Sequence, residues 1–107
     1  MNIPKKLKVG GLYYDVEITN QMHLGAANVS AEIMYDELKI RVAPNPEGRM
    51  QEDFLHEMLH AIFHGLGYRD HDEKKIDELA QALYAVIVDN PEMFDEEDIG
   101  DESAGGM

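Results

Sequence analysis

The hydrophobic pattern of this chain changes period once, at residues 44–50, and this change limits the folds open to it. Before the breaker PNPEGRM, apolar residues alternate with polar ones, as in residues 38–42, and a period of two is typical of half-buried strands. After it, apolar residues recur every three or four positions, which is typical of helices that face a core. The sequence therefore predicts an α+β domain: a short, mostly antiparallel N-terminal sheet of three to four strands packed on two antiparallel helices.

Two hairpins account for the predicted strands. In LKVGGLYYDVEI, residues 7–18, Gly10 and Gly11 separate two alternating runs, and both glycines accept the positive φ of a two-residue hairpin turn. Val16 and Ile18 are expected to share one face of that sheet. The segment ANVSAEIMYDELKIRVA, residues 27–43, predicts a second pair of strands that turns near residues 36–37. Residues 19–26 are a connection with no assigned structure.

The helices have start and stop signals as well as periodicity. Asn45 is the predicted N-cap of the first helix, with Pro46 at its first position, and residues 65–67 end it. Its expected buried stripe is Met50, Phe54, Leu55, Met58, Leu59, Ile62 and Phe63. The second helix is predicted over about residues 71–89 and ends at Asn90-Pro91. Its expected buried stripe is Ile76, Leu79, Ala80, Leu83, Val86 and Ile87.

Composition excludes several classes of function. The 107 residues suit one domain, and the absence of cysteine rules out disulfides, thiolate metal sites and a cysteine nucleophile. Any metal must therefore be held by His, Asp or Glu. The N-terminal residues lack the apolar run of a signal peptide, and no segment reaches membrane-spanning length. We expect a soluble, cytoplasmic protein, a monomer, with no membrane partner.

The net charge is strongly negative and unevenly distributed. The chain carries a formal charge of −13, and seven of its acids lie in residues 92–107, which hold no Lys or Arg. Phosphate backbones require clustered basic residues, so nucleic-acid binding is not expected. We predict a folded domain over residues 1–91 and an acidic, disordered tail over residues 92–107. A solvated tail is the simplest expectation, and a tail that folds back onto a metal site is the alternative.

The pentapeptide HEMLH, residues 56–60, is the strongest functional signal. On a helix, His56 and His60 lie one turn apart on the same face and can converge on one ion. Glu57 lies about 100° around the axis from His56, beside such a site, where a general base can take a proton from water without being a ligand. The motif therefore predicts a metal site for zinc or another borderline divalent ion.

The third ligand is expected from the second helix. His64 lies two turns from His56, about 12 Å along the axis, so its expected role is at the helix C-terminus, as a cation or by hydrogen-bonding a carbonyl. An antiparallel hairpin that turns at residues 66–67 sets His60 opposite Glu73 and His56 opposite Asp77. Glu73 is the predicted third ligand. Asp77 either accepts the free N–H of a ligand histidine or replaces Glu73 as the ligand.

Glu73 has a competing structural role. Residues 70–73, DHDE, form a possible capping box at the start of the second helix.

The segments FLHEMLHAIFHGLGY (54–68) and EKKIDELAQALYAVIVDNPE (73–92) resemble small, often phage-encoded zinc metallopeptidases of the gluzincin type, which include the minigluzincins and the ImmA/IrrE-like family. The similarity covers roughly residues 35–92, and the short sheet before it is also similar. It implies a minimal zincin-like domain that binds Zn²⁺ and acts in a bacterial host cytoplasm. The Glu73 and Asp77 pair is similar to the gluzincin glutamate ligand with its neighbouring aspartate.

Motif and resemblance together predict a zinc-dependent metalloendopeptidase that acts on a protein or peptide. His56, His60 and Glu73 would hold the metal, and Glu57 would act as general base. The substrate is expected to add as a strand along a sheet edge formed by LKIRVA, residues 38–43. Three residues are candidates by type alone for stabilising an oxyanion: Tyr68, His71 and Tyr84. The alternative is a catalytically weak or inactive metal-binding protein with a phage regulatory or interaction role on the same scaffold.

Overall fold

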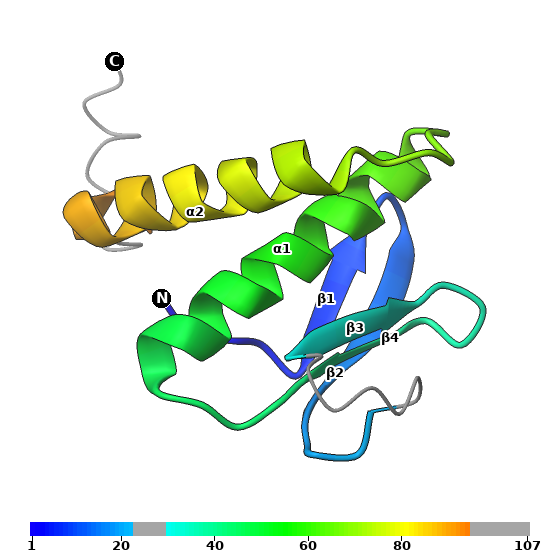
Figure 1. Cartoon of the computed structure of the whole chain (residues 1–107), viewed down its shortest axis with the longest axis horizontal. Coiled ribbons are helices and arrows are strands. Elements are labelled where there is room, and N and C mark those ends of the chain that lie inside the picture. Colours follow the sequence, from blue (N-terminus) through cyan, green and yellow to red (C-terminus); the bar gives the residue numbers. More distant parts are fainter. Residues whose placement is uncertain (23–29, 95–107) are drawn as a thin grey trace, which may run out of the picture.

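The computed structural model describes residues 1–22 and 30–94. Most of the predicted acidic tail and part of the connection at 19–26 therefore lie outside the described residues, as does any contact of the tail with the metal site. The elements are β1 (Lys6–Val9), β2 (Leu12–Ile18), β3 (Ala31–Met34), β4 (Lys39–Val42), α1 (Glu47–Gly65), α2 (Glu73–Asp89) and the 3₁₀ helix η1 (Pro91–Phe94). The predicted α+β class and the order of strands before helices are confirmed (Figure 1).

The four strands form one sheet in the order β1-β2-β4-β3. β1 and β2 are an antiparallel hairpin whose turn residues Gly10 and Gly11 have φ of 56° and 92°, so the glycine turn is confirmed. β3 and β4 form the second predicted antiparallel pair, and Leu38 in their turn also has a positive φ of 55°. The two hairpins join through a parallel pairing of β2 with β4.

That parallel pairing overturns one expectation. The segment LKIRVA was expected to form a sheet edge, but β4 lies in the interior of the sheet, between β2 and β3. The physical reason is burial: Ile40 and Val42 of β4 are 0% exposed, which a strand achieves when both of its edges are paired and one of its faces is covered. The edge next to the helices is therefore β3.

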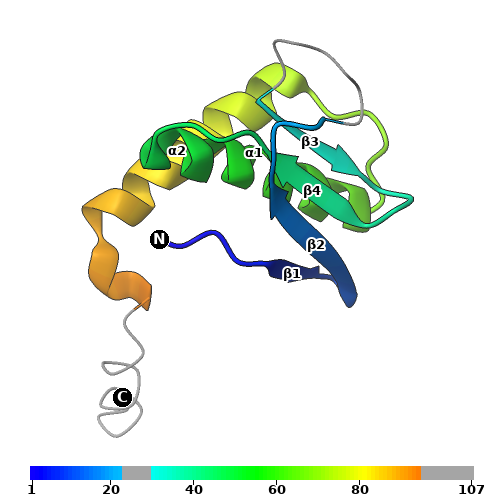
Figure 2. The ribbon, with the colours of Figure 1, turned by 90° about the horizontal axis from the view of Figure 1, so that it is seen from below.

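The helices form two further layers on one side of the sheet. α1 packs against β1, β3 and β4, and α2 runs back across α1 in roughly the opposite direction (Figures 1 and 2). The core lies where the sheet, α1 and α2 meet, and its buried side chains are Tyr14, Val16, Ile40, Val42, Phe54, Leu55, Leu59, Ala61, Ile76, Ala80 and Ile87. α1 is thus covered from two sides, by the sheet and by α2.

The predicted stripe of α2 is too wide. Ile76, Ala80 and Ile87 are buried as expected, whereas Leu79 and Val86 are each 47% exposed. Because α2 rests on α1 as an outer layer, only the narrow face toward α1 is covered. On β2, Val16 is buried but Ile18 is 52% exposed.

Both helix starts differ from the sequence prediction by one or two residues. Pro46, rather than Asn45, is the N-cap of α1 and makes no side-chain capping bond. α2 begins at Glu73 because the Asp72 side chain accepts hydrogen bonds from the backbone N–H groups of Lys74 and Lys75. The capping box proposed for residues 70–73 is therefore wrong, and Glu73 is free to point toward α1.

No helix within residues 1–22 and 30–94 is both long and apolar enough to cross a membrane. Residues 92–94, the first of the predicted tail, form the 3₁₀ helix η1 together with Pro91.

Candidate metal centre

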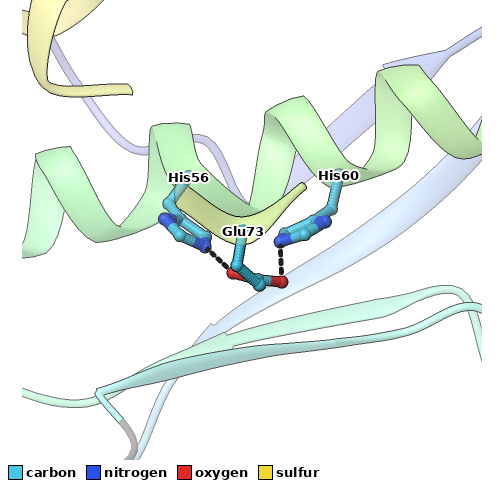
Figure 3. A group of neighbouring side chains, drawn as sticks. All are labelled: His56, His60 and Glu73. Carbon is cyan, nitrogen blue, oxygen red and sulfur yellow. Dashed lines mark hydrogen bonds and ion pairs between the residues drawn. The ribbon is translucent and has the colours of Figure 1, made fainter. Parts of the chain in front are cut away.

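His56, His60 and Glu73 converge where α2 begins beside the middle of α1 (Figure 3). The Glu73 carboxylate lies between the two rings: its Oε1 is 3.2 Å from Nε2 of His56 and its Oε2 is 2.9 Å from Nε2 of His60. The three residues offer donor atoms that all lie within 4.8 Å of one another. They are the group of His and acidic side chains that could hold a metal ion among the described residues.

Asp77 contacts this group from one turn further along α2. Its Oδ1 lies 3.4 Å from Nδ1 of His56, on the ring edge opposite to the one that faces Glu73. The side chain therefore stands where an acceptor for the free N–H of His56 is expected, and not among the converging atoms. Because α2 begins at Glu73, next to its Asp72 cap, the Glu73 carboxylate and not that of Asp77 lies between the two rings.

Hydrogen bonds behind the site determine which nitrogen of His60 carries the proton. Nε2 of His71 lies 2.9 Å from the carbonyl oxygen of Tyr68, and since that oxygen can only accept, Nε2 is the donor. In neutral His71, Nδ1 then has no hydrogen and accepts. It lies 2.8 Å from Nδ1 of His60, so His60 donates from Nδ1 and leaves its Nε2 unprotonated toward Glu73.

This protonation pattern fits a bound cation. Burial lowers the pKa of His60 and favours its neutral form, whose Nε2 then faces a carboxylate oxygen at 2.9 Å, acceptor against acceptor. A positive ion between the two removes that repulsion. Tetrahedral zinc bound to nitrogen and oxygen at about 2.0–2.2 Å holds its donors roughly 3.3 Å apart, close to the 2.9 and 3.2 Å separations here. The donor set of two imidazoles and a carboxylate therefore suits zinc or a similar divalent ion.

Glu57 is buried beside the three residues without being one of them. Its side chain is 7% exposed, and it accepts no hydrogen bond from residues 1–22 or 30–94. Burial raises its pKa from 4.5 to about 8, and the nearby charges of Glu73, Asp53 and Glu32 contribute. A carboxyl group that is poised near neutrality and faces a cleft can exchange a proton with a bound molecule.

His56, His60 and Glu73, here called the metal group, line a cleft of about 340 Å³ between the helices and the edge strand β3. We call it the metal cleft. Ala31, Ile33 and Tyr35 line it on the sheet side, opposite the metal group and Glu57. The Tyr35 ring stacks on His64 with centroids 4.0 Å apart, which fixes its position. Burial raises the pKa of Tyr35 to about 12, and the charge of Glu57 adds to this, so its hydroxyl remains protonated.

Of the two roles expected for His64, the cation at the end of α1 is disfavoured, because desolvation and the neighbouring Arg69 lower its pKa. Its ring stacks on Tyr35. Its backbone carbonyl accepts the Arg69 guanidinium at 3.0 Å.

None of the three residues considered for an oxyanion lines the metal cleft. Tyr68 is exposed, the Tyr84 hydroxyl donates to Gln51 away from the site, and His71 contacts His60. Sequence reasoning missed Tyr35, because nothing in the local pattern links a residue after the third strand to HEMLH. The one available signal was its place in the turn of the second hairpin, beside a possible edge strand.

No family model, curated protein or solved structure matches this chain. The assignment of the site therefore rests on its geometry. His56, His60 and Glu73 could hold a metal ion, and Glu57 is buried beside them.

Proposed function

We propose that this protein is a zinc-dependent peptidase. The observation that carries the proposal is the approach of His56, His60 and Glu73 around one point, with Glu57 buried beside them at the wall of an open cleft. Three protein ligands with a fourth position open to the cleft are typical of catalytic rather than structural zinc sites.

The ligand atoms are Nε2 of His56, Nε2 of His60 and the carboxylate of Glu73. Zinc bound there supplies Lewis-acid polarisation and a lowered pKa for coordinated water. Asp77 accepts the N–H of His56, and His71 accepts the N–H of His60, so each ligand ring has its proton on the nitrogen away from the metal.

Glu57 moves the proton. The carboxylate removes a proton from the attacking water as the oxygen bonds to the peptide carbonyl carbon, and it delivers that proton to the amine nitrogen when the C–N bond breaks. A pKa of about 8 without metal means that Glu57 is mostly protonated at neutral pH. Positive charge held by the three ligands favours the carboxylate form that the first step requires.

β3 can orient the peptide substrate. It is an edge strand of the sheet, and Ala31 and Ile33 lie along the cleft. An extended peptide can pair its backbone with such an edge, which presents its carbonyl groups to the site in a fixed orientation. Tyr35, at the end of β3, is the residue that we assign to hydrogen-bond the carbonyl oxygen, because its hydroxyl remains protonated and its ring is fixed on His64.

Metal analysis and cleavage together test the proposal. We expect one zinc per chain in the purified protein, none in His56→Ala, and full zinc with no cleavage of a peptide library in Glu57→Gln. His64→Ala is the matched control for zinc content, since it removes a histidine of the same helix that is not a ligand, and it should retain one zinc per chain. Stoichiometric zinc with no cleavage by the wild type would instead favour the alternative of a metal-binding interaction protein. The ion would then serve to tie α1 to α2, the two helices that supply the ligands.

A further inference from the structure

A second cleft, of about 440 Å³, adjoins the metal cleft and shares His56 and Glu57 with it. Its walls are the start of β3, the first turns of α1 and the second turn of α2. Ala31 of β3 lines both clefts. A peptide paired to β3 and centred on the metal group therefore places a neighbouring side chain over the second cleft.

The lining of this second cleft is acidic. Glu52, Asp53 and Asp77 contribute carboxylates, and Arg49 is the cation of the lining. The Arg49 guanidinium is already paired with Asp53, with Nε 3.3 Å from Oδ2. Glu52 and Asp77 have no cationic Lys or Arg partner among residues 1–22 and 30–94, so the cleft has an excess of negative charge.

Glu57 is a second, independent indication that this cleft binds a ligand. More than nine-tenths of its side chain is buried, it lines this cleft, and no residue that the structure describes donates a hydrogen bond to it. No buried side-chain oxygen among the described residues lacks a partner, so the unpaired Glu57 oxygens are accessible to solvent, and an incoming N–H group can hydrogen-bond to them from the cleft that Glu57 lines. An acidic side chain would be repelled here, and an apolar one would cover the carboxylates without pairing them.

We propose that the second cleft binds the side chain of a lysine or arginine next to the bond that is cleaved. A long, positively charged side chain complements the carboxylates of Glu52 and Asp77 and brings N–H donors toward Glu57. The inference rests on the proposed peptidase function for the placement of the peptide. The charge preference itself follows from the lining.

The test uses blocked hexapeptides that differ at one of the two central positions, which carries lysine, norleucine or glutamate. Norleucine matches the length of lysine without its charge. Dissociation constants are measured on the zinc-loaded full chain of Glu57→Gln, which binds without cleaving, and kcat/KM is measured on the wild type. We expect lysine to bind about fivefold more tightly than norleucine at one central position, with glutamate weakest, and the ratio to fall in high salt.

Two substitutions locate the effect. Glu52→Gln in either background should reduce the lysine-to-norleucine ratio about twofold, whereas Glu92→Gln, the same change on η1 outside the cleft, should leave it unchanged. Equal or tighter binding of norleucine at both positions, or no binding of any peptide, overturns the inference. Discrimination in binding without cleavage by the wild type would refute the peptidase and retain the cleft. Cleavage by the wild type without discrimination among the peptides would support the peptidase and refute the binding of a basic side chain in the second cleft.

Discussion

The Nδ1 atoms of His60 and His71 lie 2.8 Å apart, and the other ring nitrogen of His71 is 2.9 Å from the backbone carbonyl of Tyr68. The loop between the helices therefore contacts His60, a candidate metal ligand on α1, and favours the protonation of its Nδ1. His71 follows α1 by only a few residues, and its side chain returns to cover the back of the site. The loop is thus part of the candidate metal centre as well as a connection.

Replacing His71 tests this relation. His71→Leu removes the acceptor for the His60 N–H, so we expect zinc affinity to fall about 10- to 100-fold. His71→Gln can still accept from His60 with its carbonyl oxygen, and it should remain within a few fold of the wild type. Competition with a chelating dye measures the affinity. ¹⁵N NMR of the metal-free chain should show the proton of neutral His60 on Nδ1 in the wild type and not in His71→Leu.

The roles of Glu73 and Asp77 can be separated in the same way. Glu73→Ala removes the carboxylate between the histidines, so zinc binding should be lost at micromolar protein concentration. Asp77→Ala removes the contact to Nδ1 of His56, at 3.4 Å, together with a hydrogen bond from Gln81, and should weaken zinc about 10- to 100-fold. Gln81→Ala, which removes a hydrogen bond to Asp77 on the exposed side, is the control. A larger loss in Asp77→Ala would transfer the ligand role to that residue.

Glu57 makes the stability of the metal-free protein depend on pH. Its pKa is raised from 4.5 to about 8 in the folded chain, so the fold favours the protonated form. The stability that this group contributes is full below pH 4.5 and is lost as the pH rises to about 8. Glu57→Gln has no such loss. Its advantage in unfolding free energy should grow over that window, reach roughly 3 to 5 kcal/mol and stay constant above it. Urea unfolding in chelator from pH 5 to 9 measures it, and a constant difference would contradict the prediction.

Asp72 links a helix cap to the metal. Its carboxylate accepts from two backbone N–H groups at the start of α2, and Glu73 is the first residue of that helix. Asp72→Ala should cost about 1 kcal/mol of stability and also weaken zinc binding, because the first turn carries the ligand. Asp72→Asn retains the cap and should retain both properties. Thermal unfolding with and without zinc separates the two effects.

Tyr35 is expected to act on the reaction and not on the metal. Tyr35→Phe keeps the ring on His64 but removes the hydroxyl, so kcat should fall about 100-fold while zinc affinity and KM change little. Tyr68→Phe, on an exposed side chain outside the cleft, should leave kcat unchanged. A loss of zinc in Tyr35→Phe would point to a structural role.

The sequence alone determined the elements, because each depends on neighbours along the chain. Alternation and the Gly10-Gly11 pair predicted the first hairpin, and helical spacing placed His56 and His60 on one face of α1. The hairpin geometry of the helices also set Glu73 and Asp77 opposite them.

Tertiary structure decided what depends on partners distant in sequence. The parallel pairing of β2 with β4 moved residues 38–43 into the sheet and left β3 as its edge. The outer position of α2 exposed Leu79 and Val86, which periodicity alone assigns to the core. Tyr35 reached the metal cleft only through the packing of β3 against α1, and Glu57 acquired its raised pKa only through burial. The local sequence pattern determines which face of a helix or strand a side chain occupies. The packing of elements distant in sequence determines whether that face is buried and which residues it contacts.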